Sequence, residues 1–143
     1  MAGNKISLTE ILKSNGKFYH AFEVLSIEMM DNLWKHDESI ICVHPGWDLL
    51  VGWLAIRESW VTIFQNTEMI SFNITNTRVR IFDNGDIGVV VCQENIKSSV
   101  NRQQAEIGVI GTNIFERYEN RWLLIHHQGS SISNYMVPNL TPQ

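Results

Sequence analysis

The chain has 143 residues, of which 44% are hydrophobic and 18% are charged, enough to bury a sizeable core in one domain. The formal net charge is -4, and no segment concentrates Lys and Arg or alternates them with aromatic residues, which argues against nucleic acid as a partner. The apolar runs have the length of a strand and are too short to cross a bilayer, so no membrane partner is expected. With no repeat and no internal linker, residues 1–143 are predicted to form a single domain.

The N-terminal residues and the cysteines indicate a reducing compartment. Met1–Lys5 is not followed by the apolar segment of a signal peptide, so a cytoplasmic location is expected. Cys42 and Cys92 each lie in an apolar segment with the pattern of a strand, and we interpret them as buried thiols rather than as a disulfide or a nucleophile. No zinc-ligand spacing is present, and neither a metal nor a cofactor is predicted.

Three helices are predicted in the first half of the chain. Ser7 and Glu10 have the spacing of a capping box, so a helix is expected to begin at Ser7 and to carry apolar residues at three- and four-residue steps. Ser26 can cap a second, shorter helix. A third helix is predicted from about Trp53 to Phe64, where large apolar residues recur with helical spacing.

The other ordered segments are predicted to be strands. Ile40–His44 is a β-branched run that Pro45 and Gly46 bring to an end. The second half of the chain contains four long strand-like segments, which are Met69–Phe82, Ile87–Ile96, Ala105–Tyr118 and Arg121–Ser130. Asn84-Gly85 and Glu119-Asn120 supply the turns of two hairpins, because Asn-Gly accepts a positive φ.

These elements predict an α+β fold. Residues Lys97–Gln104 are expected to form a polar connection and residues 131–143 a loose C-terminal arm, which leaves a folded core of about residues 7–130. Four long twisted strands coil into a strongly curved antiparallel sheet, and the helices must cover one of its faces. Three N-terminal helices on the concave face of such a sheet enclose a cone with an interior cavity.

Several segments together resemble the SnoaL-like branch of the nuclear transport factor 2-like superfamily. Their order and spacing carry the resemblance, which runs from about Phe18 to Ser130. The segments are Phe18–Phe22, Cys42–Trp47, Gly52–Trp60, and Gly111–Phe115 with Arg121–Gln128. The resemblance implies a cone-shaped, cystatin-like pocket and a homodimer in which two sheets pack face to face. Because this superfamily includes isomerases, cyclases, dehydratases, transport factors and oligomerisation modules, the fold does not define the function.

The residues that ketosteroid isomerases of this superfamily use are replaced in this chain. Their general base is an aspartate before a proline, and the matching position is His44. Their carbonyl-polarising tyrosine matches a position near Phe18, one residue before Tyr19, and their protonated acid matches the region of Thr112 and Asn113. The resemblance therefore implies a similar pocket but argues against a steroid isomerase.

The histidines are the best candidates for acid–base chemistry. His44 could act as a general base, or it could hold the turn at Pro45 by hydrogen bonding. His126 and His127 are neighbours in a strand and must face opposite sides. The family resemblance suggests that His126 faces the interior with Trp122 and that His127 lies near a dimer interface. Neighbouring strand residues cannot converge on one metal ion, so no metal site is predicted.

Five tryptophans and a few polar residues are candidates for the wall of the pocket. Trp34 and Trp60 have helical spacing, and both core packing and a flat aromatic pocket fit them. Trp47 follows Pro-Gly in a loop and is predicted to fold over the cavity mouth as a lid. One of the neighbours Gln93 and Glu94 is expected to face the cavity, and the pattern does not say which. The predicted ligand-binding residues are Tyr19, Trp34, His44, Trp47, Trp60, Asn113, Trp122 and His126.

Three hypotheses of function follow. The favoured one is a cytoplasmic pocket domain that binds a small apolar or aromatic molecule. The second is an isomerase, dehydratase or cyclase that uses His44 as general base, with His126 or Tyr19 as proton donor or orienting group. The third is an oligomerisation or interaction module whose own side chains, among them Trp34, Trp60 and Trp122, fill the cavity.

Overall fold

The computed structural model describes the backbone of residues 2–82 and 84–137, and the side chains of this part from Ile6 on. Its helices all lie in the first half of the chain, and its long strands follow them. The elements in chain order are α1 (Ala2–Glu23), α2 (Ile27–Leu33), β1 (Ile41–Val43), β2 (Leu50–Val51), α3 (Trp53–Gln65), β3 (Met69–Ile81), β4 (Ile87–Val100), β5 (Gln103–Tyr118) and β6 (Arg121–Ser131).

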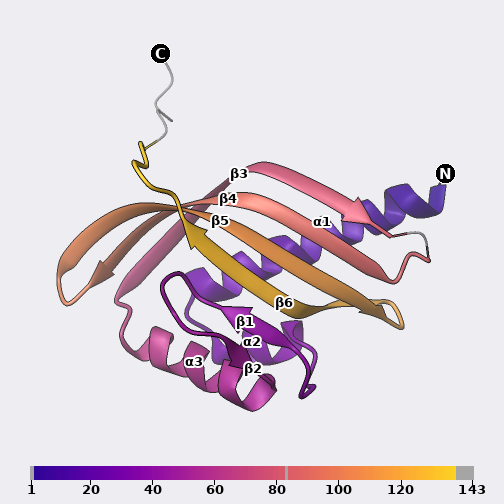
Figure 1. Cartoon of the computed structure of the whole chain (residues 1–143), viewed down its shortest axis with the longest axis horizontal. Helices are drawn as coiled ribbons and strands as arrows, with labels where there is room; N and C mark the ends of the chain where they lie inside the picture. Colours follow the sequence, from indigo (N-terminus) through magenta and orange to yellow (C-terminus); the bar gives the residue numbers. More distant parts are fainter. Residues whose placement is uncertain (1, 83, 138–143) are drawn as a thin grey trace.

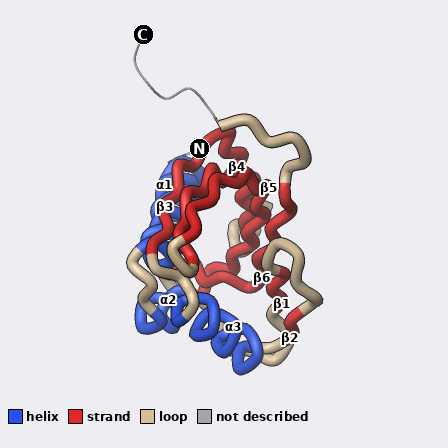
Figure 2. Tube along the Cα trace, turned by 90° about the vertical axis from the view of Figure 1, so that its left-hand side faces the viewer, coloured by secondary structure: helices blue, strands red, loops and turns tan. Residues whose placement is uncertain are grey.

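The six strands form one sheet in the order β2-β1-β6-β5-β4-β3. The long strands β3 to β6 pair antiparallel, while the short β1 runs parallel to β6 and carries β2 at the edge of the sheet. α1 runs behind the long strands in Figure 1, and α2 and α3 lie at one end of the curved sheet in Figure 2. The predicted α+β cone is therefore confirmed, with a sheet that is mixed rather than purely antiparallel.

Two β-bulges decide which side chains face the interior of the cone. β3 carries one extra residue opposite β4 between Thr75 and Arg78, where Asn76 has a positive φ of 54°. β6 carries another at Ile125, opposite the step from Ile114 to Phe115. Because side chains alternate along a strand, each extra residue moves the inward side from even-numbered to odd-numbered positions.

The core lies between α1 and the concave face of the sheet. Phe18 of α1 is fully buried and meets the rings of Trp34 and Trp60 edge-on, with centroid distances of 6.3 and 5.7 Å. Such pairs contribute about 0.5–1.5 kcal/mol each beyond the burial of their area. Val90 of β4 and Phe115 of β5 are also fully buried and cover these rings from the side of the sheet. Aromatic side chains therefore occupy the middle of the cone.

Two predicted boundaries are wrong. α1 begins at Ala2, so Ser7 lies inside the helix and does not cap it. The residues before Ser7 include no proline, so they can continue the helix toward the N-terminus. Residues Lys97–Gln104, predicted to be a polar connection between strands, form the tip of the β4–β5 hairpin, which turns at Asn101 and Arg102 with φ of 51° and 64°. This hairpin extends beyond the helices in Figure 1, so solvent reaches both faces of its tip, which explains the polar residues there.

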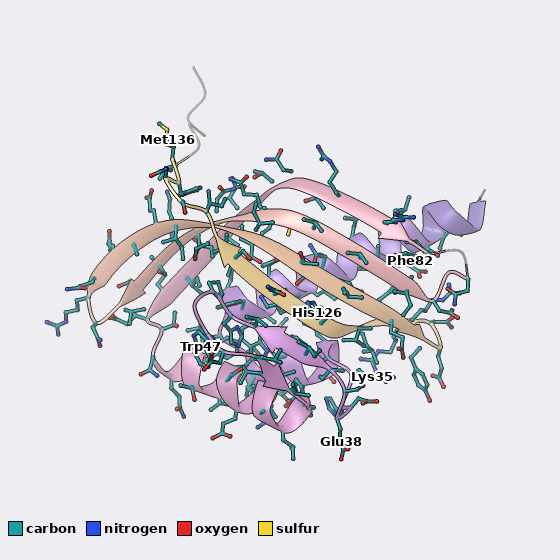
Figure 3. The ribbon with its side chains drawn as sticks, in the orientation of Figure 1. Lys35, Glu38, Trp47, Phe82, His126 and Met136 are labelled. Atoms are coloured by element: carbon teal, nitrogen blue, oxygen red, sulfur yellow. The ribbon has the colours of Figure 1, made fainter. Side chains whose placement is uncertain are left out.

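The first part of the C-terminal arm is anchored to the outer face of the sheet. The Ile132 backbone N–H donates to the Gly108 carbonyl at 2.8 Å, and the Tyr135 hydroxyl donates to Asn95 Oδ1 at 2.7 Å. The Tyr135 ring lies against Gly108, where any Cβ would collide with it. The arm is thus held as far as Tyr135, in contrast to the loose arm predicted for residues 131–143. Met136 beyond it is 85% exposed (Figure 3), and residues 138–143 lie outside the described part.

Candidate functional site

A chain of hydrogen bonds crosses the interior from β6 to β4. His127 Nδ1 donates to Asn113 Oδ1 at 2.5 Å, and Asn113 Nδ2 donates to the Tyr19 hydroxyl at 3.1 Å and to Asn15 Oδ1 at 2.8 Å. The Tyr19 hydroxyl in turn donates to Glu94 Oε2 at 2.5 Å. All five residues are buried, so the chain is a polar cluster in an otherwise apolar core. We call these residues the interior polar cluster.

Glycine at position 111 makes room for this cluster. A Cβ at Gly111 would collide with the Glu94 carboxyl and lie 3.0 Å from the Tyr19 hydroxyl. Gly111 pairs with Cys92 across the sheet, and the Cys92 thiol lies 3.3 Å from the same hydroxyl. The absence of a side chain at this one position therefore allows Tyr19 and Glu94 to meet on the concave face.

Burial changes the ionisation of the Tyr19–Glu94 pair. Desolvation raises the pKa of Glu94 to about 7, although the hydrogen bond from Tyr19 acts in the opposite direction. Desolvation also raises the pKa of Tyr19, with further contributions from the neighbouring Glu94 and Cys92. Near neutral pH the Glu94 carboxyl is consequently divided between its protonated and ionised forms, and it can give or take a proton.

His44 faces the same interior from the end of β1. Its Nε2 lies 2.9 Å from Ser59 Oγ, and the Ser59 hydroxyl donates to the Ile56 carbonyl at 2.6 Å. Because that proton is committed, Ser59 accepts from His44, which places the hydrogen on Nε2 and leaves Nδ1 as the basic nitrogen. Burial lowers the pKa of His44 to about 4, so the imidazole is neutral at pH 7. Burial raises the pKa of the adjacent Cys42 thiol, which is therefore not a nucleophile.

The two neighbouring histidines of β6 are placed the other way round from the prediction. His127 is 2% exposed, contacts the Phe18 and Trp60 rings at centroid distances of 5.0 and 6.2 Å, and belongs to the interior polar cluster. His126 is half-buried on the opposite face of β6 (Figure 3), so its predicted place in the pocket is wrong. The reason is the bulge at Ile125, which shifts the inward side by one residue.

His127 is the more strongly perturbed of the two histidines. Burial lowers its pKa to about 3, and the nearby His44 and His126 add to this effect. The rings of His127 and His44 have centroids 6.3 Å apart, so both imidazoles belong to one interior region. Both are neutral at pH 7, because burial lowers the pKa of His44 to about 4 and that of His127 to about 3.

Trp34 and Trp60 lie in the interior as predicted, and their indole nitrogens are buried. Trp60 is fully buried and meets the His44 ring edge-on at 4.6 Å. The Nε1 groups of Trp34, Trp60 and Trp122 have no acceptor among the described residues. An unpaired buried donor costs about 1–3 kcal/mol, so these indole N–H groups favour an acceptor from outside the described residues.

The loop between β1 and β2 covers one side of the interior. Pro45 lies against Gly129, where a Cβ would come within 2.9 Å of it, and near Val109. Trp47 remains 42% exposed and meets the His44 ring edge-on at 5.0 Å (Figure 3 labels Trp47). Trp47 therefore lies beside His44 and close to solvent, and its role as a lid stays a prediction.

Trp122 lies away from the rings of His44 and Trp60, in the wall of a surface groove between α1, α2 and the β5–β6 turn. The groove has a volume of about 350 Å³, and two further cavities have volumes of about 170 and 420 Å³. Neither His44 nor any residue of the interior polar cluster lines these three spaces. Asn95 and Phe72, which line the 170 Å³ cavity, do not belong to the cluster. In this conformation the aromatic side chains fill the interior, so a molecule could bind there only if they or the Pro45–Trp47 loop moved.

Within the part of the chain that the structure describes, no cluster of three or more His, Cys, Asp or Glu side chains could hold a metal ion. No described helix is long and apolar enough to span a membrane. Cys42 and Cys92 are both buried free thiols, as predicted.

A family model described as a SnoaL-like domain matches residues 11–134. The chain belongs to the SnoaL-like family. The domain is 29% identical to a solved structure of a candidate dehydratase of the NTF2-like family from Streptomyces avermitilis, with a TM-score of 0.83 and coverage of 90% of this chain and 98% of that one. A 14% identical NTF2-like superfamily protein from Salmonella enterica shares the fold, with a TM-score of 0.83 and coverage of 94% and 96%.

The SnoaL-like domain also resembles part of a longer plant protein. It is 25% identical over 120 residues to the F-box protein SKIP8 of Arabidopsis thaliana, which covers 84% of this chain and 48% of that protein. The chain thus spans about half the length of this curated relative. The SnoaL-like, NTF2-like assignment rests on the family model and the solved structures, and the specific function is argued from the site.

The sequence predicted several of the site residues but not Asn15 or His127, and it left the carboxylate open. Tyr19, His44, Trp60 and Asn113 were predicted, and the structure brings them to one interior region. Glu94 was one of two open choices, and its burial between Tyr19 and Gly111 is what identifies it. The glycine at 111, in an apolar strand, was the available signal, because it marks a close approach of another group to the backbone.

Proposed function

We propose that this SnoaL-like domain binds a small, largely apolar molecule in the interior of the cone, between α1 and the concave face of the sheet. The observation that carries the proposal is the interior polar cluster, in which a few convergent polar groups are surrounded by aromatic rings. Sites of this composition, with perturbed pKa values, are typical of small-molecule pockets. The cluster would bind the polar end of the ligand, and Trp60, Phe18 and Phe22 would contact its apolar body.

Entry of the ligand requires a movement that the fold allows. Trp47 and Pro45 belong to a loop without regular structure and lie between His44 and solvent. A ligand that displaced Trp47 would meet the His44 ring first, because Trp47 lies against that ring. It would then meet Trp60, whose ring also lies against the His44 ring. A hydrogen-bond acceptor on the ligand would also pair with the indole N–H of Trp60, which has no acceptor among the described residues. This hydrogen bond would offset part of the free energy needed to displace the rings.

A second copy of the chain and a cytoplasmic location are also part of this proposal. Apolar side chains on the outer face of the long strands, among them Val89, Val91, Ile114 and Leu123, are only half-buried in the single chain. An apolar face in the middle of a sheet is suited to packing against its own copy, and packing two such faces would bury all four side chains. We therefore propose a homodimer through this face.

Native mass spectrometry of the purified chain tests the ligand and the dimer together. The expected spectrum shows twice the chain mass and an additional ligand mass. Tyr19→Phe removes the hydroxyl that joins Asn113 to Glu94 and should reduce the ligand-bound fraction about tenfold, whereas the exposed Tyr118→Phe should leave it unchanged.

The two parts of this proposal fail separately. A chain with the mass of a monomer would contradict the homodimer alone. A chain that carries no ligand mass, and whose melting temperature is not raised by any member of a library of small apolar compounds, would contradict the pocket.

An acid–base enzyme is the second candidate, because one interior contains a neutral imidazole and a carboxyl with a pKa of about 7. In a dehydration, His44 Nδ1 would take a proton from carbon and protonated Glu94 would give one to the leaving hydroxyl, so that a C=C bond forms as C–H and C–O break and water leaves. The similar Streptomyces avermitilis structure is described as a candidate dehydratase, which supports this class of reaction.

His44→Gln separates this enzyme from a binding protein. Loss of a general base lowers turnover of the molecule found by mass spectrometry by about 100-fold or more, while the affinity for it stays within about threefold. His20→Gln, an exposed histidine on the outside of α1, is the matched control with an unchanged rate. Equal turnover in the His44→Gln variant and the native chain would exclude His44 as the base.

A further inference from the structure

A half-open groove lies between α1, α2 and the turn that joins β5 to β6. Its volume is about 350 Å³, in the lower part of the range of small-molecule sites. The groove is separate from the interior polar cluster, and its features stand whether or not the proposed function holds. Its lining residues come from α1, α2 and the β5–β6 turn, and this turn is far from both helices in the sequence, so only the folded chain forms the groove. They include Lys13, Lys17, Met29, Leu33, Arg121 and Trp122.

Positive charge is concentrated on the rim of this groove. Lys13 and Lys17 are four residues apart on α1 and therefore lie on the same face of the helix, one turn from each other. Arg121 lies across the groove, and its Nη2 donates to the Asn32 carbonyl at 2.5 Å, which holds the guanidinium at the rim. Glu10 is the one carboxylate among the lining residues, in a chain whose overall net charge is -4.

No described carboxylate neutralises these three cations. Among the described residues no ion pair joins Lys13, Lys17 or Arg121 to a carboxylate, although Lys35, Arg57, Lys97 and Arg117 each have one. Cations gathered on one rim repel each other, and an anion between them relieves that repulsion. The groove therefore favours a negatively charged group.

The floor of the groove is apolar. Trp122 and Leu33 are 4% and 8% exposed, and Met29 is half-buried and packs against the core. The guanidinium of Arg117 lies 5.9 Å from the centre of the Trp122 ring and fixes that ring from another side. A ligand with an apolar body could lie on this floor while its charged end reaches the lysines.

We propose that this groove binds a small amphipathic carboxylate, with its aromatic or aliphatic body on Trp122, Leu33 and Met29 and its carboxylate between Lys13, Lys17 and Arg121. The cations on the rim and the apolar floor match the two ends of such a molecule. The volume limits the ligand to a small body, which distinguishes it from a polyanion that would need an extended basic surface.

Isothermal titration calorimetry with 2-naphthoate and 2-naphthol tests the proposal, because the two molecules share a ring system and differ in charge at pH 7. Naphthoate should bind at least about tenfold more tightly, and its affinity should fall as salt is raised from about 50 to 500 mM. The double variant K13Q/K17Q should lose about tenfold in naphthoate affinity and nothing in naphthol affinity.

The matched control is K97Q/R102Q, which removes two charges from the β4–β5 hairpin and should keep the native affinity. Circular dichroism of both double variants checks that they fold, since all four side chains are exposed. Equal affinities for the two probes, equal losses in the two double variants, or no naphthoate binding at millimolar concentration would each overturn the proposal.

Discussion

Glu94→Gln is expected to remove a fall in stability of about 3 kcal/mol that the native Glu94 causes between about pH 4.5 and pH 7. Burial raises the pKa of this carboxyl from 4.5 to about 7, so the folded state holds the proton more tightly than the unfolded state does. Its stabilising contribution is therefore complete below pH 4.5 and is lost as the pH rises through 7. Glutamine keeps the hydrogen bond from Tyr19 and carries no charge at any pH.

The buried histidines act in the opposite direction over part of this range. Burial lowers the pKa of His44 to about 4 and that of His127 to about 3, so their contributions are complete above pH 6.5 and are lost as the pH falls. The two effects partly cancel in the native chain between about pH 4.5 and 6.5. The quantity to measure is therefore the difference in unfolding free energy between Glu94→Gln and the native chain at each pH.

Urea denaturation at half-unit steps from pH 4 to pH 8.5 gives this difference. The difference should grow in favour of Glu94→Gln as the pH rises and level off above about pH 7.5. Glu58→Gln, on the exposed side of α3, should give a difference near zero throughout. A Glu94→Gln difference that is flat with pH would show that the carboxyl titrates normally and that the interior polar cluster is open to water.

Trp60→Ala is expected to destabilise the fold by about 3–5 kcal/mol, a large part of the total stability of a typical domain. Trp60 is fully buried and contacts rings from α1 and β6 and from the ends of α2 and β1, so its loss leaves a cavity in the middle of the core. For a chain of this size the melting temperature should fall by about 10 °C or more, as measured by calorimetry.

Trp47→Ala is the control, because Trp47 is 42% exposed and its removal should cost less than about 1 kcal/mol. Indole added to Trp60→Ala should restore part of the lost stability by occupying the cavity, since apolar cavities bind matching apolar ligands. Failure of indole to bind, with a loss of stability as expected, would favour the third hypothesis, in which the interior is packing alone. A loss below about 1 kcal/mol would contradict the ring-filled core.

The fold was predictable because its signals are local. The alternating segments and their turns at Asn84-Gly85 and Glu119-Asn120 identify two long hairpins, and helical spacing identifies α3. The two-residue strand β2 has no such signal, because its backbone pairs with β1 only once the loop of Trp47 has closed. The extended tip of the β4–β5 hairpin was also missed, since polar residues on a solvated strand have the composition of a loop.

The candidate site was less predictable because it depends on contacts between distant residues. The choice between Gln93 and Glu94 is decided by Gly111 and Tyr19, which lie 17 and 75 residues away from Glu94 in the sequence. The orientation of His126 and His127 depends on one extra residue in β6, and bulges leave little trace in the apolar pattern when both faces of a strand are apolar. The chemistry of the interior is therefore set by pairing and not by composition.

The bulge at Ile125 gives the pair His126-His127 a further significance. If β6 continued from Leu124 in regular register, Ile125 would lie opposite Ile114 and His126 opposite Asn113; with the bulge, His127 lies opposite Asn113 instead. An imidazole is thus available to the interior in either register, so a one-residue shift of β6 past β5 at this point would exchange one histidine for the other instead of removing the imidazole. The doubled histidine makes the hydrogen-bond chain through Tyr19 and Glu94 tolerant of a one-residue change in the register of β6.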